Sequence, residues 1–430
     1  MQGLSQDTHS LNKSSKWGAK DNLDNDNAIS STHQNEPIES SLNSSKVKFP
    51  KRKSPHGETD FTEFVHWILD TFYKKYCSSC GSQVSSKDKL PSRPHKARCK
   101  CKSRKDVSLW VRTPLHHFKL PYWMFGFVIF EELTRYPQVI SSSELSRRLG
   151  ISRKASLLLK RRVQLFAKDR VEEIKVIMKK ELEDTWQDVQ IPMNDPDFSL
   201  KTLDNYDKIP STDTMAMFSA SQRANKGRSR YKHSGQTSSI FLSEKLVEEK
   251  GKYQIGTLVN SINIKGKGVV LESIPNQQQI TIRPLLDEVI SKDVPLMSDE
   301  GIPWYGHHNK NHFTVNHSKK SDYFPRYKYS RERWCTKQSV HNQATEGFFR
   351  NLKYSFVAGY SYISPEFSQM YLDEYSFAKG FLVYLREILA LQDGTENNKG
   401  ASDDSLETDM MLNSTYKLLP RQDSNLRQGG

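Results

Sequence analysis

The sequence predicts an α/β domain in the second half of the chain, preceded by a small cysteine-containing segment and a helical region. Two observations predict this order. Between residues 212 and 390, short segments rich in β-branched and apolar residues alternate with longer segments whose apolar residues recur at helical spacing. Upstream, residues 77–101 hold four of the five cysteines, and residues 141–166 show two adjoining helical patterns. Strands and helices mixed within one block favour a sheet covered by helices.

The composition argues against a membrane or secreted protein. The most apolar run of the 430 residues, 121–130, is far shorter than a bilayer-spanning helix. The N-terminal residues lack the apolar core of a secretory signal. The 64 Lys and Arg residues exceed the 50 Asp and Glu residues, which gives a formal net charge of +14. This excess favours a polyanionic partner, and nucleic acid is the first candidate.

We expect five segments along the chain. Both ends are rich in polar residues and lack an apolar period, so they are predicted to be disordered. A polar connector separates the two ordered blocks. The predicted segments are a tail at 1–56, a zinc-ribbon-like segment at 57–110, a helix-turn-helix region at 111–185, an α/β domain at 212–390 and a tail at 391–430.

Local patterns define the elements within the ordered blocks. Residues 61–76 repeat apolar side chains at helical spacing and predict the first helix. The predicted strands of the second block are 214–221, 255–264, 268–274, 294–299 and 315–318. Its predicted helices are 283–291, 344–356 and 368–390.

Cys77, Cys80, Cys99 and Cys101 form two close pairs, Cys-Ser-Ser-Cys and Cys-Lys-Cys. A two-residue gap lets both thiolates of the first pair reach one tetrahedral zinc ion from a knuckle turn. The second pair is tighter than usual, and His95 is an alternative ligand in place of one of its thiolates. Four cysteines without metal are the other interpretation. Basic residues surround the second pair and are expected to contact phosphates without reading sequence: Arg93, Lys96, Arg98, Lys100, Lys102, Arg104 and Lys105.

Residues 141–166 have the pattern of a helix-turn-helix. Ser142 or Ser143 is expected to cap the first helix, Gly150 to supply the left-handed residue of the turn, and Ser152 to cap the second helix. The N-terminal end of the second helix is where recognition helices usually touch base edges. An ordinary helical hairpin with a solvated basic face is the alternative. The predicted DNA-contacting residues of the second helix are Arg153, Lys154, Lys160, Arg161 and Arg162.

Carboxylates in the α/β block mark a candidate reaction centre. Asp299 ends an apolar strand, where a carboxylate can face a cleft. Downstream, Asn342, Glu346, Phe349 and Lys353 are spaced so that they share one helix face. Two such carboxylates can bind divalent metal ions that activate water for attack on a phosphate, with Lys353 holding the DNA backbone. Taken singly, Asp299 could instead cap a turn, and Glu346 could be a surface charge paired with Lys353.

Together, these segments resemble bacterial insertion-sequence transposases that combine a zinc ribbon, a helix-turn-helix and an RNase H-like DDE domain. The likeness spans about residues 60–385 and rests mainly on the motifs SDEG, VNHS and HNQATEGFFRNLK, in that order. It implies an RNase H-like mixed sheet, Mg²⁺ or Mn²⁺ held by Asp299, Glu346 and Asn342, and Zn²⁺ in the ribbon. It places His317 and Lys353 at motif positions.

The resemblance also implies an activity and partners. The activity is cleavage at transposon ends followed by joining of the 3′ ends to target DNA. The protein would act as a homodimer or higher oligomer on DNA, in the bacterial cytoplasm and associated with the nucleoid.

One departure from the family pattern bears on activity. The family's first acid stands in an opening strand, and the matching strand at 214–221 carries Ser219 at that place, a poor ligand for Mg²⁺. Asp213 lies about 20 Å further back in a fully extended chain. We therefore expect a complete site only if Asp213 approaches Asp299 and Glu346, and we favour an impaired enzyme. A repurposed, catalytically inactive DNA-binding protein is the alternative.

Overall fold

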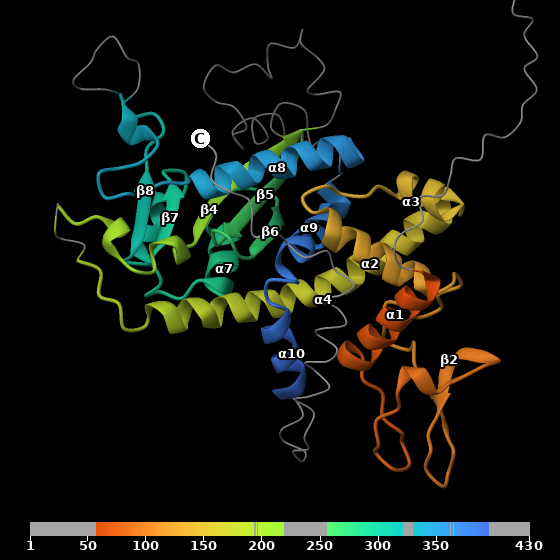
Figure 1. Ribbon diagram of the computed structural model, residues 1–430. Helices are drawn as coiled ribbons and strands as arrows, with labels where there is room; N and C mark the ends of the chain where they lie inside the picture. The colour runs from red at the N-terminus through yellow and green to blue at the C-terminus, as the bar shows by residue number, and fades with distance from the viewer. Residues whose placement is uncertain are drawn as a thin grey trace, which may run out of the picture. The chain divides into compact units, whose positions relative to one another are not determined.

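A five-stranded mixed sheet forms the centre of the C-terminal half of the structure (Figure 1). The computed structural model describes residues 57–218, 256–320 and 330–394, apart from 193–194, 196, 362 and 364. The predicted tail at 1–56 lies outside these residues, as does most of the predicted tail at 391–430. The described residues all belong to one compact unit.

The sheet has the strand order β6-β5-β4-β7-β8. Its strands are β4 (Ser211–Phe218), β5 (Gly256–Asn263), β6 (Val269–Ile274), β7 (Leu296–Asp299) and β8 (His312–Val315). β4, β5 and β6 pair antiparallel, whereas β4, β7 and β8 pair parallel. This arrangement confirms the predicted α/β class and its mixed sheet.

The opening strand begins earlier than the sequence pattern suggested. We predicted a strand at 214–221, but β4 runs from Ser211 to Phe218, so Asp213 lies inside the strand. Ser219 lies outside the described residues. The placement of Asp213 upstream of the strand was therefore wrong. No alternation of polar and apolar residues marks the strand's start, because residues 211–214 are all polar.

Helices cover both faces of the sheet. They are α7 (Gln279–Val289), α8 (Gln343–Tyr360), α9 (Ser368–Gly380) and α10 (Leu385–Gly394), joined by α4 (Arg153–Trp186) from the N-terminal half. Met215, Met217 and Val259 pack against α8 and α9 on one face. On the other face, Ala216 and Leu258 belong to a core shared with α4 and α7. Figure 1 shows α8 on one side of the strands and α7 with α4 on the other.

The N-terminal half consists of a small sheet and four helices. The sheet is antiparallel, with strands β1 (Lys89–Leu90), β2 (Arg93–Arg98) and β3 (Asp106–Ser108). The helices are α1 (Glu58–Phe72), α2 (Trp123–Arg135), α3 (Ser142–Leu149) and α4. None of the described helices is long and apolar enough to cross a membrane.

α3 and α4 form a helical pair whose ends follow capping rules. Ser141, not Ser142 or Ser143, caps α3 and accepts a hydrogen bond from the Glu144 amide at 3.2 Å. Gly150 ends α3 in the left-handed region, with φ of 68°, where a side chain would be strained. Ser152 caps α4 by accepting from the Ala155 amide.

α4 extends far beyond the predicted second helix of this pair. It has 34 residues, and its C-terminal half lies against the sheet domain. Ile174 and Met178 are fully buried there, in the core shared with α7. The same continuous helix therefore belongs both to the predicted DNA-binding region and to the core of the α/β domain.

A buried lysine joins the N-terminal helices to α9. The Lys160 amine is 1% exposed and donates to Glu132 of α2 at 2.9 Å, to the Ile140 carbonyl at 2.6 Å and to Glu374 of α9 at 2.5 Å. We predicted that Lys160 contacts DNA, and this was wrong because no phosphate can reach the amine. Burial and the nearby Glu374 charge hold the pKa of Glu132 well above its usual range, which favours its protonated form.

The protonation of Glu132 gives a stability prediction. Glu132→Gln should change the free energy of unfolding little, because the amide resembles the protonated acid in shape and charge. Lys160→Met should lower it by about 3–5 kcal/mol, because it leaves the Glu374 charge buried without its partner. Chemical denaturation at neutral pH measures both values. Equal losses for the two variants would contradict the assignment of the charges.

Candidate functional site

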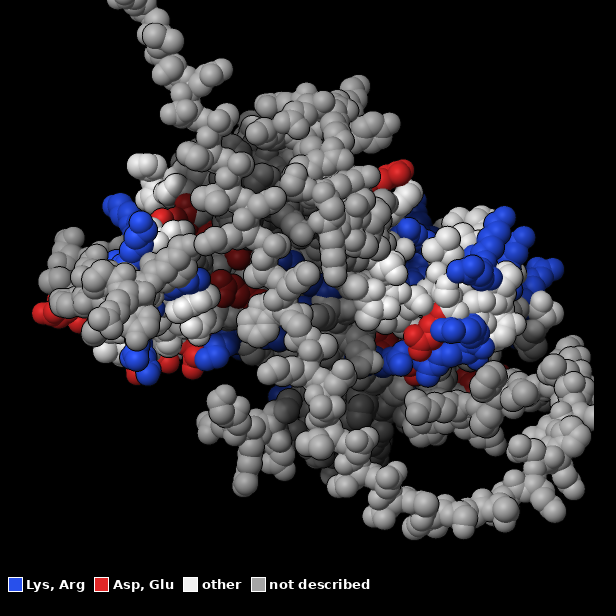
Figure 2. Space-filling model, turned by 90° about the horizontal axis from the view of Figure 1, so that it is seen from above, with Lys and Arg blue, Asp and Glu red and all other residues white. Residues whose placement is uncertain are grey.

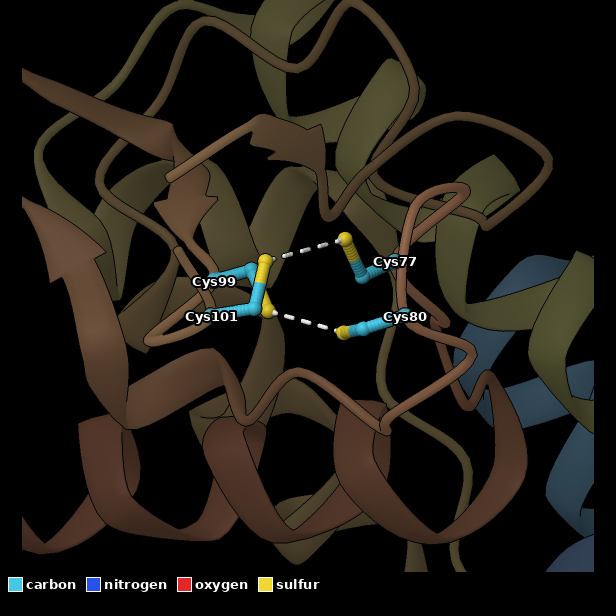
Figure 3. A group of neighbouring side chains, drawn as sticks. All are labelled: Cys77, Cys80, Cys99 and Cys101. Atoms are coloured by element: carbon cyan, nitrogen blue, oxygen red, sulfur yellow. Dashed lines mark hydrogen bonds between the residues drawn. The ribbon is translucent and has the colours of Figure 1, made fainter. Parts of the chain in front are cut away.

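The four cysteines converge at the edge of the small sheet (Figure 3). Their sulfur atoms all lie within 4.8 Å of one another. The closest pairs are Cys80 and Cys99 at 3.5 Å and Cys77 and Cys101 at 3.9 Å. A tetrahedral zinc ion with bonds of about 2.3 Å to sulfur separates its ligand atoms by roughly 3.8 Å. The cluster therefore fits a zinc ribbon, including the tight Cys-Lys-Cys pair.

Two turns present these thiols. In the first, the Gly81 amide donates to the Cys77 carbonyl, and Gly81 has a φ of 72° that favours glycine. In the second, the Arg104 amide donates to the Cys101 carbonyl. The hydroxyl of Ser103 lies 2.9 Å from the Cys101 sulfur and lowers the pKa of that thiol to about 6, which favours the thiolate that binds metal.

His95 and Cys335 stay apart from this cluster. The His95 ring lies against Trp110, with centroids 5.9 Å apart, and His95 is not among the grouped metal-binding side chains of the described residues. Cys335 is an exposed free thiol. The four cysteines alone are thus the candidate ligand set.

The exposed basic residues of the helical pair lie around the turn that joins α3 to α4. Arg153 and Lys154 are exposed in the first turn of α4, and Arg147 is exposed in the last turn of α3. Figure 2 shows Lys and Arg side chains gathered over the end of the molecule where α3 lies. This surface is the candidate DNA interface of the helical pair.

Arg161 and Arg162 are less exposed than the basic residues of this surface. Arg161 lies over the rings of Phe367 and Tyr371 at about 5 Å and donates to Gln164 at 2.7 Å. Its guanidinium is therefore engaged within the protein, on the side of the helix that faces α9. Arg162 is partly buried.

Asp213 and Asp299 lie side by side on adjacent strands. β4 and β7 run parallel, with Ser211 opposite Met297 and Thr212 opposite Ser298. The next pair in this register is Asp213 and Asp299. Neighbouring strands are about 4.8 Å apart and residues in register share a face, so both carboxylates emerge together. The pairing of β4 with β7 thus places Asp213 next to Asp299.

Both carboxylates face α8. Ser211 lies on the same side of β4 as Asp213, and its hydroxyl is 2.6 Å from that of Thr345 in the first turn of α8. Met215, two residues beyond Asp213, packs into the core formed with this helix. Glu346 follows Thr345 directly, so α8 delivers a third carboxylate to this end of the sheet. Asp213, Asp299 and Glu346 are called the acidic cluster below.

The acidic cluster is electrostatically strained. Burial and the charges of Asp299 and Glu346 together raise the pKa of Asp213 to about 8, although the Thr214 amide and Lys353 act to lower it. Three acids that repel one another next to a single lysine form an arrangement that a bound divalent cation would stabilise. Oxygen-only ligands of this kind suit Mg²⁺ or Mn²⁺ rather than zinc.

Gly301 holds the Asp299 carboxylate in place. The Gly301 amide donates to Asp299 Oδ1 at 2.9 Å. A Cβ atom at Gly301 would come within 2.8 Å of the same oxygen, so any larger residue would displace it. This contact gives the glycine of the SDEG motif a physical reason.

The remaining predicted site residues occupy the start and the outer side of α8. Lys353 is exposed two turns beyond Glu346, close enough to affect Asp213. Asn342 precedes the helix as its N-cap residue instead of lying on its face. Its side chain is fully buried, and its polar atoms have no hydrogen-bond partner among the described residues.

His317 also lies at this site. The resemblance placed it at a motif position but assigned it no function. It lies two residues after the end of β8, and its Nε2 lies 3.4 Å from Glu346 Oε1. Its position two residues after a strand that pairs with β7 was the available signal.

The comparisons with known proteins agree with this geometry. Residues 219–379 match the family model of the ISXO2-like transposase domain. Over these residues the chain is therefore similar to ISXO2-like transposases. A search of curated proteins and a search of solved structures each gave no match.

The match confirms the resemblance to insertion-sequence transposases. The matched part of the transposase domain includes Asp299, His317, Asn342, Glu346 and Lys353. It begins just after β4, so the assignment of Asp213 to the acidic cluster rests on the strand register and on electrostatics.

The cysteine cluster predicts one tightly bound zinc ion per chain. Elemental analysis of the full-length protein should find one equivalent, and Cys80→Ser should lose it because three thiolates bind zinc far more weakly than four. Cys335→Ser is the matched control and should keep the metal. A metal-free protein whose stability does not respond to chelator would contradict the prediction.

The exposed end of α4 predicts how DNA affinity depends on charge. Binding should weaken steeply as salt increases, because the basic residues displace counterions from phosphates. Arg153→Ala should cost about 1–3 kcal/mol and relax sequence preference if Arg153 reads a base edge. Arg162→Ala should weaken all sequences by a similar factor. Fluorescence anisotropy on specific and scrambled duplexes measures both, and an unchanged preference in Arg153→Ala would place the reading surface elsewhere.

Proposed function

We propose that this protein is a transposase-type DNA-processing enzyme that binds the ends of a mobile element and catalyses metal-dependent strand cleavage and transfer. The match of residues 219–379 to the ISXO2-like transposase domain model supports a transposase-type function. The activity, the DNA partner and the metal ions are the proposed part. One observation carries the proposal. Asp213 of β4 lies beside Asp299 of the neighbouring strand β7, and the charges of Asp299 and Glu346 raise the pKa of Asp213.

Divalent metal ions, when bound, would supply an activated water and neutralise charge at the phosphate. Asp213, Asp299 and Glu346 are the proposed ligands. Asp213 is proposed to serve as the first acid of the family pattern, whose expected position holds Ser219 in this chain. Asp213 must lose its proton to bind the metal, which the raised pKa resists and the cation favours. Lys353 is proposed to hold a DNA phosphate next to the acidic cluster, since the residue is exposed and its charge acts on Asp213.

The N-terminal half is proposed to deliver the DNA. The helical pair offers Arg147, Arg153 and Lys154 to the duplex, and the ribbon adds exposed charges at Lys102, Arg104 and Lys105. Contacts of the latter kind provide affinity without specificity. Dimerisation on DNA is proposed because cleavage and joining of two ends require that both ends be held together.

The geometry of Asp213 favours an active enzyme over the impaired one that the sequence suggested. The rival function is a DNA-binding protein without cleavage. It would retain the helical pair and the ribbon, and it would have no need for three repelling acids at one end of the sheet.

Replacing Asp213 tests the proposal. Asp213→Asn should reduce Mg²⁺-dependent cleavage of a labelled element end to the uncatalysed level, because the amide cannot supply the charge that the metal requires. DNA affinity should stay within about twofold of the wild-type value. Asp204→Asn is the matched control, since Asp204 is an exposed acid outside the acidic cluster, and it should cleave normally. A wild-type protein that binds element ends and never cleaves them in Mg²⁺ or Mn²⁺ would support the rival function.

A further inference from the structure

We infer that Leu157 and Leu158 determine part of the DNA sequence preference, because their side chains contact the C5-methyl groups of thymines in the major groove. The inference rests on the proposed function, since it concerns how the helical pair binds an element end. It adds an apolar contact with the bases to the charged contacts proposed for Arg153 and Lys154.

Both leucines are exposed in the second turn of α4. Leu157 is 41% exposed and Leu158 is 57% exposed, whereas Leu159, the next residue, is fully buried. Apolar side chains scattered singly over a protein surface are common and need no partner. Here two neighbouring leucines lie next to Arg153 and Lys154, which are exposed as well. These four residues are called the reading face below.

Helical spacing explains why the reading face is continuous. Residues four positions apart lie one above the other on a helix, so Leu157 follows Arg153 and Leu158 follows Lys154. One turn further on, the Arg161 guanidinium lies over the rings of Phe367 and Tyr371 and is engaged within the protein. The part of this face that is free for a partner is therefore its first two turns, and half of its side chains are apolar.

The charges around the leucines favour DNA over a second copy of the chain. Arg153 and Lys154 lie on the reading face, and Arg147 is exposed nearby in the last turn of α3. Two copies of this surface would bring like charges together, which opposes self-association. A DNA duplex offers phosphates to the cations, and the thymine methyl is the apolar group that base edges present in the major groove.

The geometry of the helix predicts where the thymine lies. Leu158 follows Arg153 by five residues, which corresponds to about 7.5 Å along the helix axis. Base pairs are stacked about 3.4 Å apart. The thymine that faces the leucines should therefore lie within about two base pairs of the base that Arg153 contacts.

Replacing thymine by uracil tests the contact, because deoxyuridine lacks only the C5-methyl group. The probe is the duplex that the wild-type full-length protein selects from a random-sequence library, resynthesised with deoxyuridine at one thymine at a time. Wild-type protein should bind about 3–10-fold more weakly when the uracil lies next to the base sensitive to Arg153→Ala, as expected for the loss of one buried methyl group. Fluorescence anisotropy measures the dissociation constants.

A double-mutant cycle separates direct contact from a general loss of affinity. The variant with both Leu157→Ala and Leu158→Ala should bind the thymine and uracil duplexes equally, because alanine does not reach the methyl group. Alanine is a good helix former, so the thermal midpoint should not fall. Val176→Ala is the matched control at a 58% exposed position in the C-terminal half of α4, and it should keep the wild-type difference between the duplexes.

The possible results have distinct meanings. Equal affinity of the wild-type protein for thymine and uracil at every position, or a difference that persists in the double variant, would overturn the inference. A double variant that keeps the difference but no longer self-associates in sedimentation velocity would assign the leucines to a contact between copies instead.

The same measurements distinguish this inference from the proposed function. If Asp213→Asn abolishes cleavage while uracil has no effect on binding, the proposed function stands and only this inference fails. If uracil weakens the binding of a wild-type protein that never cleaves, the inference stands and the proposed catalysis fails. If the wild-type protein binds no duplex, both fail.

Discussion

The buried amine of Lys160 connects the two halves of the structure. It lies where α2, α4 and α9 meet, and Glu374 extends the network through hydrogen bonds from Gln164 at 2.7 Å and Tyr360 at 3.2 Å. Burying these charges is costly, and the cost is offset only while every partner stays in place. A displaced α9 would leave a lysine and a glutamate buried without compensation. The network therefore specifies one arrangement of the helices.

This constraint has a consequence for how DNA would meet the acidic cluster. Arg153 and Lys160 are seven residues apart on one continuous helix, which corresponds to about 10 Å along its axis. The helix end that carries the exposed arginine is thus tied to the element that packs on the sheet. One continuous helix, α4, therefore joins the candidate DNA interface to the α/β domain.

The acidic cluster illustrates the opposite use of charge. Lys160 and its acids compensate one another in the core, whereas Asp213, Asp299 and Glu346 repel one another at the end of the sheet. That repulsion lowers the stability of the fold, and the packing of the surrounding elements offsets it. The Gly301 amide donates to the Asp299 carboxylate, so the backbone fixes one of the acids before any cation arrives.

The sequence by itself determined the elements and the chemical groups. Helical periodicity, strand composition, Gly150 and Ser152 were sufficient to place the turn between α3 and α4, the start of α4 and most strands, because these signals are local. Cysteine spacing identified the four cysteines that cluster in the structure for the same reason. The motifs around Asp299 and Glu346 identified the transposase domain, since their residue types are tied to its chemistry.

Only the tertiary structure decided which residues meet. Asp213 joins the acidic cluster because β4 pairs with β7 in a register that no local pattern encodes, and a strand start misplaced by three residues hid it. Lys160 looked like a DNA contact on a basic helix, and the packing of α9 turned it into a core ion pair. Contacts between residues over 200 positions apart, such as Lys160 with Glu374, depend on the folded chain as a whole.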